Sequence, residues 1–284
     1  MTSRHARLDG RRGFTIVELL VSLVISSVVL LSLTRLLAVQ GRAFGKQREL
    51  GDVNESLRTG AAFLAWELRQ LSPADGDIYA MGQRTITVRS ITATGIVCAE
   101  HATQPLFALS SAEGDVAETS ADSALILNVG GAGTADDDWK AMRVGSRGTA
   151  ASLGVGNCVW DASTPDAAIT VQPASAADTA GVAVGAPVRL FRRVEYALYQ
   201  DGAEWWLGQK VAGAASYEKL TGPLLADAQD GLEFRYYDAA GTAVAVPAQV
   251  AVVEIRIRSH STHNSSADGS PQTGFLVTKV APRG

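Results

Sequence analysis

Residues 11–34, RRGFTIVELLVSLVISSVVLLSLT, constrain the fold more than any other part of the chain. Between Phe14 and Thr34 the only charged residue is Glu18. As an α-helix this segment would be roughly 32 Å long, about the thickness of a bilayer core. A carboxylate in hydrocarbon costs roughly 2.5–3.5 kcal/mol on insertion scales. The sequence therefore predicts one membrane helix, over about residues 14–36, whose acidic residue needs a functional explanation.

The charge distribution predicts the orientation of that helix. Four arginines (Arg4, Arg7, Arg11 and Arg12) and one acid, Asp9, precede it, whereas the whole chain has a formal net charge of −4. Basic flanks stay on the cytoplasmic side of a membrane, so the N-terminus is expected in the cytoplasm and the rest outside it. An acidic body without a basic patch argues against nucleic-acid binding.

A cleaved secretory signal does not fit residues 14–39, because its apolar region would be about 7–15 residues long and a small-residue cleavage site would follow. The helical pattern instead continues. Apolar residues recur at steps of three and four on one face (Val53, Leu57, Ala61, Leu64, Leu68 and Leu71), and Ser72-Pro73 ends the pattern. We expect a leader at 1–13 and one helix over 14–72. Glycines, each costing about 1 kcal/mol against alanine, should make 35–51 its softest part.

From residue 73 to residue 284 the pattern becomes that of strands and turns. Short alternating or β-branched runs predict strands at 84–91, 95–98, 124–129, 168–171, 188–200, 204–211, 231–237, 249–258 and 274–280. Stretches rich in Ala, Gly, Ser and Asp, at about 110–122, 130–138 and 146–156, are interpreted as surface loops. The predicted fold class is α+β: a long N-terminal helix whose second half packs on a β-rich exported head.

The two cysteines, Cys98 and Cys158, leave two alternatives open. In an exported head they can form a disulfide, which would close a loop of about 60 residues and stabilise the fold by about 4 kcal/mol. They can also be two unrelated buried thiols.

The local pattern Gly13-Phe14-Thr15-Ile16-Val17-Glu18, with arginines before it and an apolar helix after it, closely resembles the class III leader of type IV pilins and of type II secretion pseudopilins. The resemblance implies that a membrane-embedded prepilin peptidase cuts between Gly13 and Phe14 and methylates the new amine of Phe14. It further implies a bacterial inner-membrane protein with a periplasmic head, which is later incorporated into a filament.

The resemblance also explains the acid in the membrane. In a bundle of such helices, the Glu18 carboxylate of one subunit can meet the Phe14 amine of a neighbour. Desolvation cancels much of the energy of this pair, so its main effect is to fix the axial register between subunits. A first-turn acid is also favoured by the helix dipole, but the dipole gives no reason to place it in lipid.

The size of the head favours a minor subunit that primes or caps a filament. Residues 187–258 loosely resemble the heads of PilW-type minor pilins and of J-type minor pseudopilins: a strand ending in Tyr199, the Trp205-Trp206 strand, residues 233–238 (EFRYYD) and a strand led by Pro247. The pilus-type member is preferred, with the J-type pseudopilin as the alternative. The expected partners are the prepilin peptidase and other major and minor pilins or pseudopilins, which bind through the N-terminal helix.

Two other function classes remain, a filament-tip adhesin and an anchored exported enzyme. No catalytic residue comes with the resemblance, and none is predicted. His260 and His263 lack an evident third metal ligand, and Cys98 with His101 is a poor candidate for a nucleophile pair. The consecutive acids Asp136, Asp137 and Asp138 are weak calcium candidates, since a calcium loop has alternating ligands. No cofactor is otherwise expected. Trp205 and Trp206 should lie on opposite faces of a strand, one in the core and one available to a partner.

Overall fold

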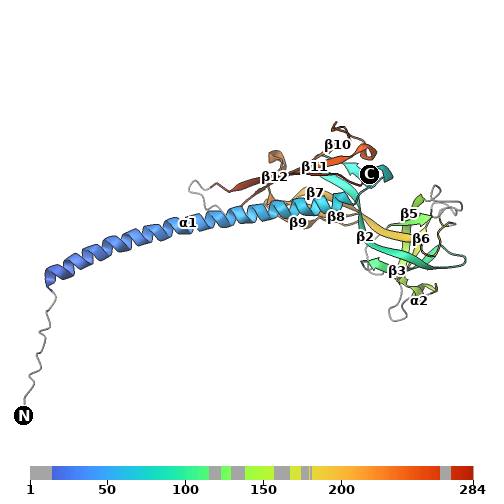
Figure 1. The fold of residues 1–284 in the computed structure, drawn as a ribbon, viewed down its shortest axis with the longest axis horizontal. Coiled ribbons are helices and arrows are strands. Elements are labelled where there is room, and N and C mark those ends of the chain that lie inside the picture. Colours follow the sequence, from blue (N-terminus) through green and yellow to red (C-terminus); the bar gives the residue numbers. More distant parts are fainter. Residues whose placement is uncertain are drawn as a thin grey trace, which may run out of the picture. The chain divides into compact units, whose positions relative to one another are not determined.

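We describe the protein from a computed structural model, which covers residues 15–114, 123–128, 138–156, 167–173, 179, 181–262 and 270–283 (Figure 1). The chain forms two compact units. The first consists of 1–53 with 261–272, and the second of 54–260 with 273–284. Helix α1, Ile16–Arg69, is shared between them.

Between Ile16 and Val39, α1 is apolar on all sides apart from Glu18, Arg35 and a few hydroxyl side chains. Its large apolar side chains between Ile16 and Val39 are 52–80% exposed within the chain. A helix that is hydrophobic all round requires an apolar environment, and this one is long and apolar enough to cross a membrane. Thr15 begins the helix, since its side-chain oxygen accepts a hydrogen bond from the backbone N–H of Glu18 at 3.2 Å.

The second unit is built on one antiparallel sheet. Its short helical elements are η1 (Pro73–Asp75), α2 (Ala150–Leu153), η2 (Asp227–Gln229) and η3 (Pro247–Gln249). Its strands are β1 (Ile78–Met81), β2 (Thr85–Glu100), β3 (Leu106–Glu113), β4 (Ser123–Asn128), β5 (Asp138–Thr149), β6 (Ala167–Gln172), β7 (Pro187–Asp201), β8 (Glu204–Val211), β9 (Glu218–Leu224), β10 (Leu232–Tyr237), β11 (Val252–His260) and β12 (Thr273–Val280).

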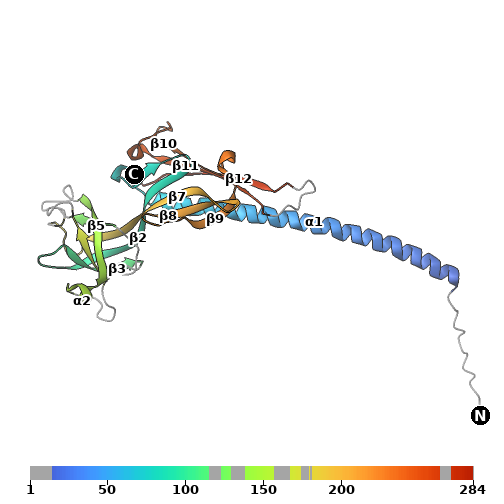
Figure 2. The same cartoon turned by 180° about the vertical axis from the view of Figure 1, so that it is seen from behind.

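Part of the sheet closes on itself. The strand order β2-β3-β6-β5-β4-β7 is completed by pairing of β7 with β2, which gives a ring of six antiparallel strands. Figures 1 and 2 show β3, β5 and β6 gathered around the end of β2. The interior of the ring is packed with apolar side chains, namely those of Ala93, Val97, Phe107, Leu109, Ala124, Ile126, Met142, Ile169, Val171, Val182, Ala186, Val188 and Leu190. The ring is thus a second hydrophobic core and is filled by its own side chains.

The rest of the sheet packs on residues 54–69 of α1. Leu57, Ala61, Leu64 and Leu68 are buried, as is Leu71 just beyond the helix. On the sheet the buried partners include Tyr196, whose ring lies 5.6 Å from that of Phe63 in an edge-to-face pair. The 3.6-residue spacing of these apolar positions places them on one side of the helix, and this side is the one that the sheet covers.

Gly60 marks the closest approach of the helix to the sheet. A Cβ atom at this position would lie 2.8 Å from Thr221 Cγ2 and 3.3 Å from Ile257 Cδ1. Thr221 cannot turn away easily, because its hydroxyl donates to the Ser56 carbonyl at 3.1 Å while the Ser56 hydroxyl donates to the Gly222 carbonyl at 3.0 Å. At Gly41 and Gly51, by contrast, a Cβ would meet nothing within 4 Å.

The predicted α+β, pilin-like architecture is confirmed: a long apolar N-terminal helix is followed by a β-rich head. Two of the predicted loops are wrong where the structure describes them. Residues 106–113 and 138–149 are strands β3 and β5, and 150–153 form α2. The small and polar residues in these segments were interpreted as loop signals. In a strand only every second side chain points into the ring, so the others can be small or polar.

Gly60→Ala should lower the free energy of unfolding of the head by about 1–3 kcal/mol, because the added methyl group overpacks the contact with Thr221. Gly51→Ala is the matched control on the same helix, and it should leave stability unchanged or raise it by up to about 1 kcal/mol through helix propensity. Denaturant titration of the detergent-solubilised chain, followed by tryptophan fluorescence, measures both. Equal effects of the two substitutions would contradict this packing.

Candidate functional site

The N-terminal segment carries the residues that the sequence singles out. Glu18 lies in the first turn of α1 with an exposed side chain. One turn later, the Ser22 hydroxyl donates to the Glu18 carbonyl at 2.7 Å, so this hydroxyl is satisfied within the helix. The carboxylate thus projects from a helix whose neighbouring side chains are apolar. Gly13 and Phe14 lie outside the described residues, and the predicted cleavage between them stays a prediction.

The other polar candidates do not come together into a site. Asp138 pairs with Lys140 at 2.7 Å, and this hydrogen bond lowers the pKa of the aspartate, while Asp136 and Asp137 lie outside the described residues. His260 Nε2 lies 3.2 Å from Glu204 Oε2, and His263 lies outside the described residues. The described part of the chain contains no group of three or more His, Cys, Asp or Glu side chains that could hold a metal ion.

Cys98 lies on β2 and packs against a small apolar cluster that includes Leu106 and Ala108. Its predicted partner, Cys158, lies outside the described residues, so the disulfide stays a prediction. His101 Nδ1 accepts a hydrogen bond from the backbone N–H of Thr103 at 3.3 Å. Trp205 and Trp206 are neighbours on β8, and both are half-buried, so neither is the fully buried core residue that the sequence suggested.

A carboxylate is buried where α1 meets the sheet. Glu67 is only 8% exposed, and its side chain accepts hydrogen bonds from the hydroxyls of Tyr196 and Ser90, with the charge of Arg192 nearby. Burial raises the pKa of Glu67, and the two hydroxyls and Arg192 oppose this shift. The pKa of Tyr196 is raised as well, chiefly by burial and then by the neighbouring carboxylate.

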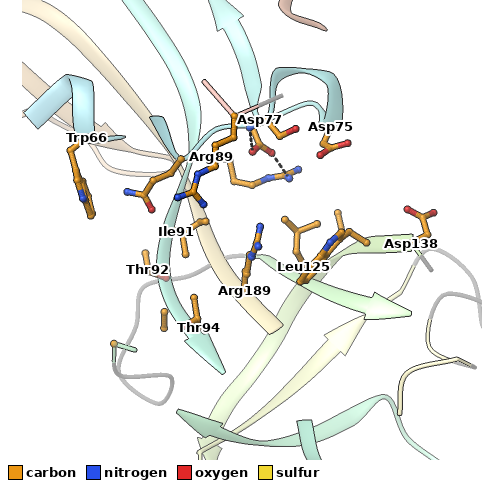
Figure 3. Close-up of a pocket in the computed structure, with 17 residues that line it drawn as sticks. Trp66, Asp75, Asp77, Arg89, Ile91, Thr92, Thr94, Leu125, Asp138 and Arg189 are labelled. Carbon is orange, nitrogen blue, oxygen red and sulfur yellow. Dashed lines mark hydrogen bonds and ion pairs between the residues drawn. The ribbon is translucent and has the colours of Figure 1, made fainter. Parts of the chain in front are cut away.

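A cleft of about 870 Å³ opens beside the end of α1 (Figure 3). One wall comes from α1 and η1 and includes Trp66 and Asp75; the floor comes from the outward-facing side chains of β2, β4, β5 and β7. Two further lining residues, Arg89 of β2 and Asp77 between η1 and β1, form a buried ion pair at 2.5 Å, and the backbone N–H of Ser72 donates to Asp77 Oδ2 at 2.8 Å. Burial nevertheless raises the pKa of Asp77.

Two arginines that line the cleft lie over aromatic rings. The guanidinium carbon of Arg189 lies 4.7 Å from the ring centroid of Trp139, and that of Arg89 lies 4.4 Å from the centroid of Phe191. A planar guanidinium on an aromatic ring is held flat, while its N–H groups at the edge remain able to donate.

The comparisons with known proteins bear on the N-terminal segment. Residues 8–34 match the family model described as the prokaryotic N-terminal methylation motif. This match covers Gly13, Phe14 and Glu18 and supports a type IV pilin-like or pseudopilin subunit that is anchored in the membrane. No curated protein and no solved structure matches the chain.

The cleft was missed by the analysis of the sequence. One signal could have pointed to it: Trp66 falls between Leu64 and Leu68, off the buried face of the helix, and is 58% exposed. Arg189 and Trp139 gave no comparable signal, because they lie on different strands and meet only through pairing of β4 with both β5 and β7.

Glu67→Gln should gain stability relative to the wild-type chain as the pH rises. The folded-state pKa of Glu67 is raised, so the folded wild type holds this proton more tightly than the unfolded chain does. Its free energy of unfolding therefore falls as the pH rises from the unfolded pKa of 4.5 through the folded pKa. The neutral amide of Gln does not titrate, so the variant does not lose this free energy. The measurement is the difference in free energy of unfolding between the two chains, in detergent, from about pH 4 to about pH 7. Tyr196→Phe removes a hydrogen-bond donor that lowers the pKa of Glu67, so it should enlarge the total loss of unfolding free energy between low and high pH. A pH-independent difference for Glu67→Gln would contradict the assignment.

Proposed function

We propose that the chain is a minor pilin-like structural subunit that prepilin peptidase processes and that primes or caps a type IV pilus. The observation that supports this most is the methylation motif at residues 8–34, which contains Glu18 and runs directly into a helix able to span a membrane. The head that follows contains a second hydrophobic core, and its large size favours a minor subunit over one repeated along the whole filament.

In this proposal Glu18 is an assembly residue. Leader removal would leave a positive amine on Phe14, four residues before Glu18 in the sequence. Both charges are costly in lipid, and the pairing of one subunit's carboxylate with a neighbour's amine offsets part of that cost. The resulting register would set the axial step of the filament, and the major and minor pilins would be the partners of the helix.

Processing can be tested on the protein from its own host. Intact-mass analysis of membrane and sheared-filament fractions should find a chain that begins at N-methyl-Phe14, and the filament fraction should contain it. Gly13→Leu should block cleavage, because a bulky side chain does not fit a peptidase pocket shaped for glycine. An uncut wild-type chain confined to the membrane fraction would overturn the proposal.

Glu18→Val should still insert into the membrane, since it removes a cost of roughly 2.5–3.5 kcal/mol, but should fail to enter filaments. Ser22→Val is the matched control, because it also replaces a polar side chain with valine one turn away, and it should assemble normally. Immunoblotting of membrane and filament fractions measures both steps separately. Normal incorporation of Glu18→Val would show that the carboxylate is not the assembly residue.

The J-type pseudopilin of type II secretion is the alternative within the same class. The region of resemblance folds as two antiparallel pairs, β7 with β8 and β10 with β11, and it fits either member. A specific observation favours a further role as a filament-tip adhesin. Trp139, in the region 100–180, lines the open cleft together with Trp66.

A further inference from the structure

The cleft beside α1 is lined by three arginines and three aspartates, which differ in whether they are paired. Arg89 is paired with Asp77, and Asp138 is paired with Lys140. Among the described residues, Arg189 and Arg283 line the cleft and have no acidic partner within ion-pair distance. The guanidinium carbon of Arg189 lies over the Trp139 ring, 4.7 Å from its centroid, and this contact favours one placement of the side chain. A guanidinium whose face lies on an aromatic ring keeps N–H groups at its edge, and these can bind a carboxylate through two parallel hydrogen bonds.

The cleft also offers an aromatic surface and polar groups. Trp66 is 58% exposed at one end, and Figure 3 shows Arg189 between it and Asp138 at the other end. Asp75 and Gln70 add hydrogen-bonding groups to the wall formed by the end of α1 and the residues after it. An indole beside hydrogen-bonding side chains suits a ligand that has an apolar face and a rim of hydroxyl groups, as a sugar ring has.

The architecture disfavours two other ligands. The floor is the face of strands that are already paired on both edges, since β7 pairs with β2 and β4, and β4 pairs with β5. An extended peptide could not add to these strands and would leave its own backbone unpaired. A nucleic acid or polyphosphate does not fit either, because its closely spaced charges need several unpaired cations. Among the described lining residues only Arg189 and Arg283 lack an acidic partner, and Asp75, Asp77 and Asp138 line the same cleft.

We propose that this cleft binds an acidic oligosaccharide, a chain of uronic acid units. Arg189 receives a carboxylate, Trp66 contacts the apolar face of a sugar ring, and the remaining polar side chains bind hydroxyl groups. The volume of about 870 Å³ lies within the usual range of ligand sites. This inference rests on the adhesin role that the same cleft favours and names its ligand class, but it does not depend on the proposed role in filament assembly.

Isothermal titration calorimetry tests the inference on the full chain, in a detergent without a sugar headgroup. The probes are trimers of galacturonate and of mannuronate, with the methyl-esterified galacturonate trimer as the neutral counterpart. We expect at least one acidic trimer to bind at millimolar concentration or below, and its neutral form to bind about tenfold more weakly. Arg189→Ala and Trp66→Ala should each weaken binding about tenfold.

Arg193→Ala is the matched control. Arg193 lies on the same strand and stacks on an aromatic ring in the same way, 4.2 Å from the centroid of Tyr79, but it does not line the cleft. This variant should bind like the wild type. Circular dichroism shows that each variant is folded.

The inference is overturned if neither acidic trimer binds, or if Arg189→Ala binds as tightly as Arg193→Ala. It is also overturned if a triglutamate peptide binds as tightly as the sugar, because the ligand would then be peptide. Filament incorporation is not measured here, so failure leaves the proposed assembly role untouched.

Discussion

The antiparallel pairing of β2 with β7 is the interaction on which the rest of the head depends. The two strands pair from Thr85 with Ala197 to Ile96 with Pro187. Toward one end they carry the sheet that covers α1, and toward the other end they close the ring. The change of role coincides with a register shift between Ile91 and Ala93, and with the point where the other partner of β7 changes from β4 to β8. Irregular pairing redirects side chains, and the cleft lies at this junction, lined by residues 91–94.

Helix α1 is one continuous element that must suit two environments, lipid in its first part and the β-sheet of the head at its end. In its first part the apolar side chains face outward on every side, which suits lipid. Residues 54–69 instead bury one apolar face, and Trp66 is the large apolar side chain exposed outside that face. Its glycines differ accordingly. Gly41 and Gly51 have open space around them, but Gly60 is required by the close contact with Thr221. A glycine that looks like a weak point in the sequence can therefore be a packing requirement.

Features with a local cause were predictable from the sequence. The helix, its buried face at Leu57, Leu64 and Leu68, and most strands follow from hydrophobic spacing alone. The ring did not, because closure depends on which distant strands pair, and alternation in β3 and β5 is obscured by small and polar residues. The same limit applies to the sites. The motif around Glu18 is contiguous, so it could be recognised in the sequence. The cleft is assembled from α1, β5 and β7, and its one signal in the sequence is Trp66, which falls outside the apolar face of the helix.

A comparison of two glutamates on α1, Glu18 and Glu67, indicates why the N-terminal segment requires a partner from another molecule. Glu67 is buried, but the fold supplies the hydroxyls of Tyr196 and Ser90 and the charge of Arg192. These groups of the same chain offset part of the free-energy cost of removing the carboxylate from water. For the carboxylate of Glu18, the described residues supply no such partner: only its backbone groups are engaged, by Thr15 and Ser22. An acid in lipid without an internal partner is tolerated only if something else provides one. A neighbouring subunit that presents a positive amine at the same depth would do so, and assembly would then stabilise the charge that the isolated chain leaves exposed.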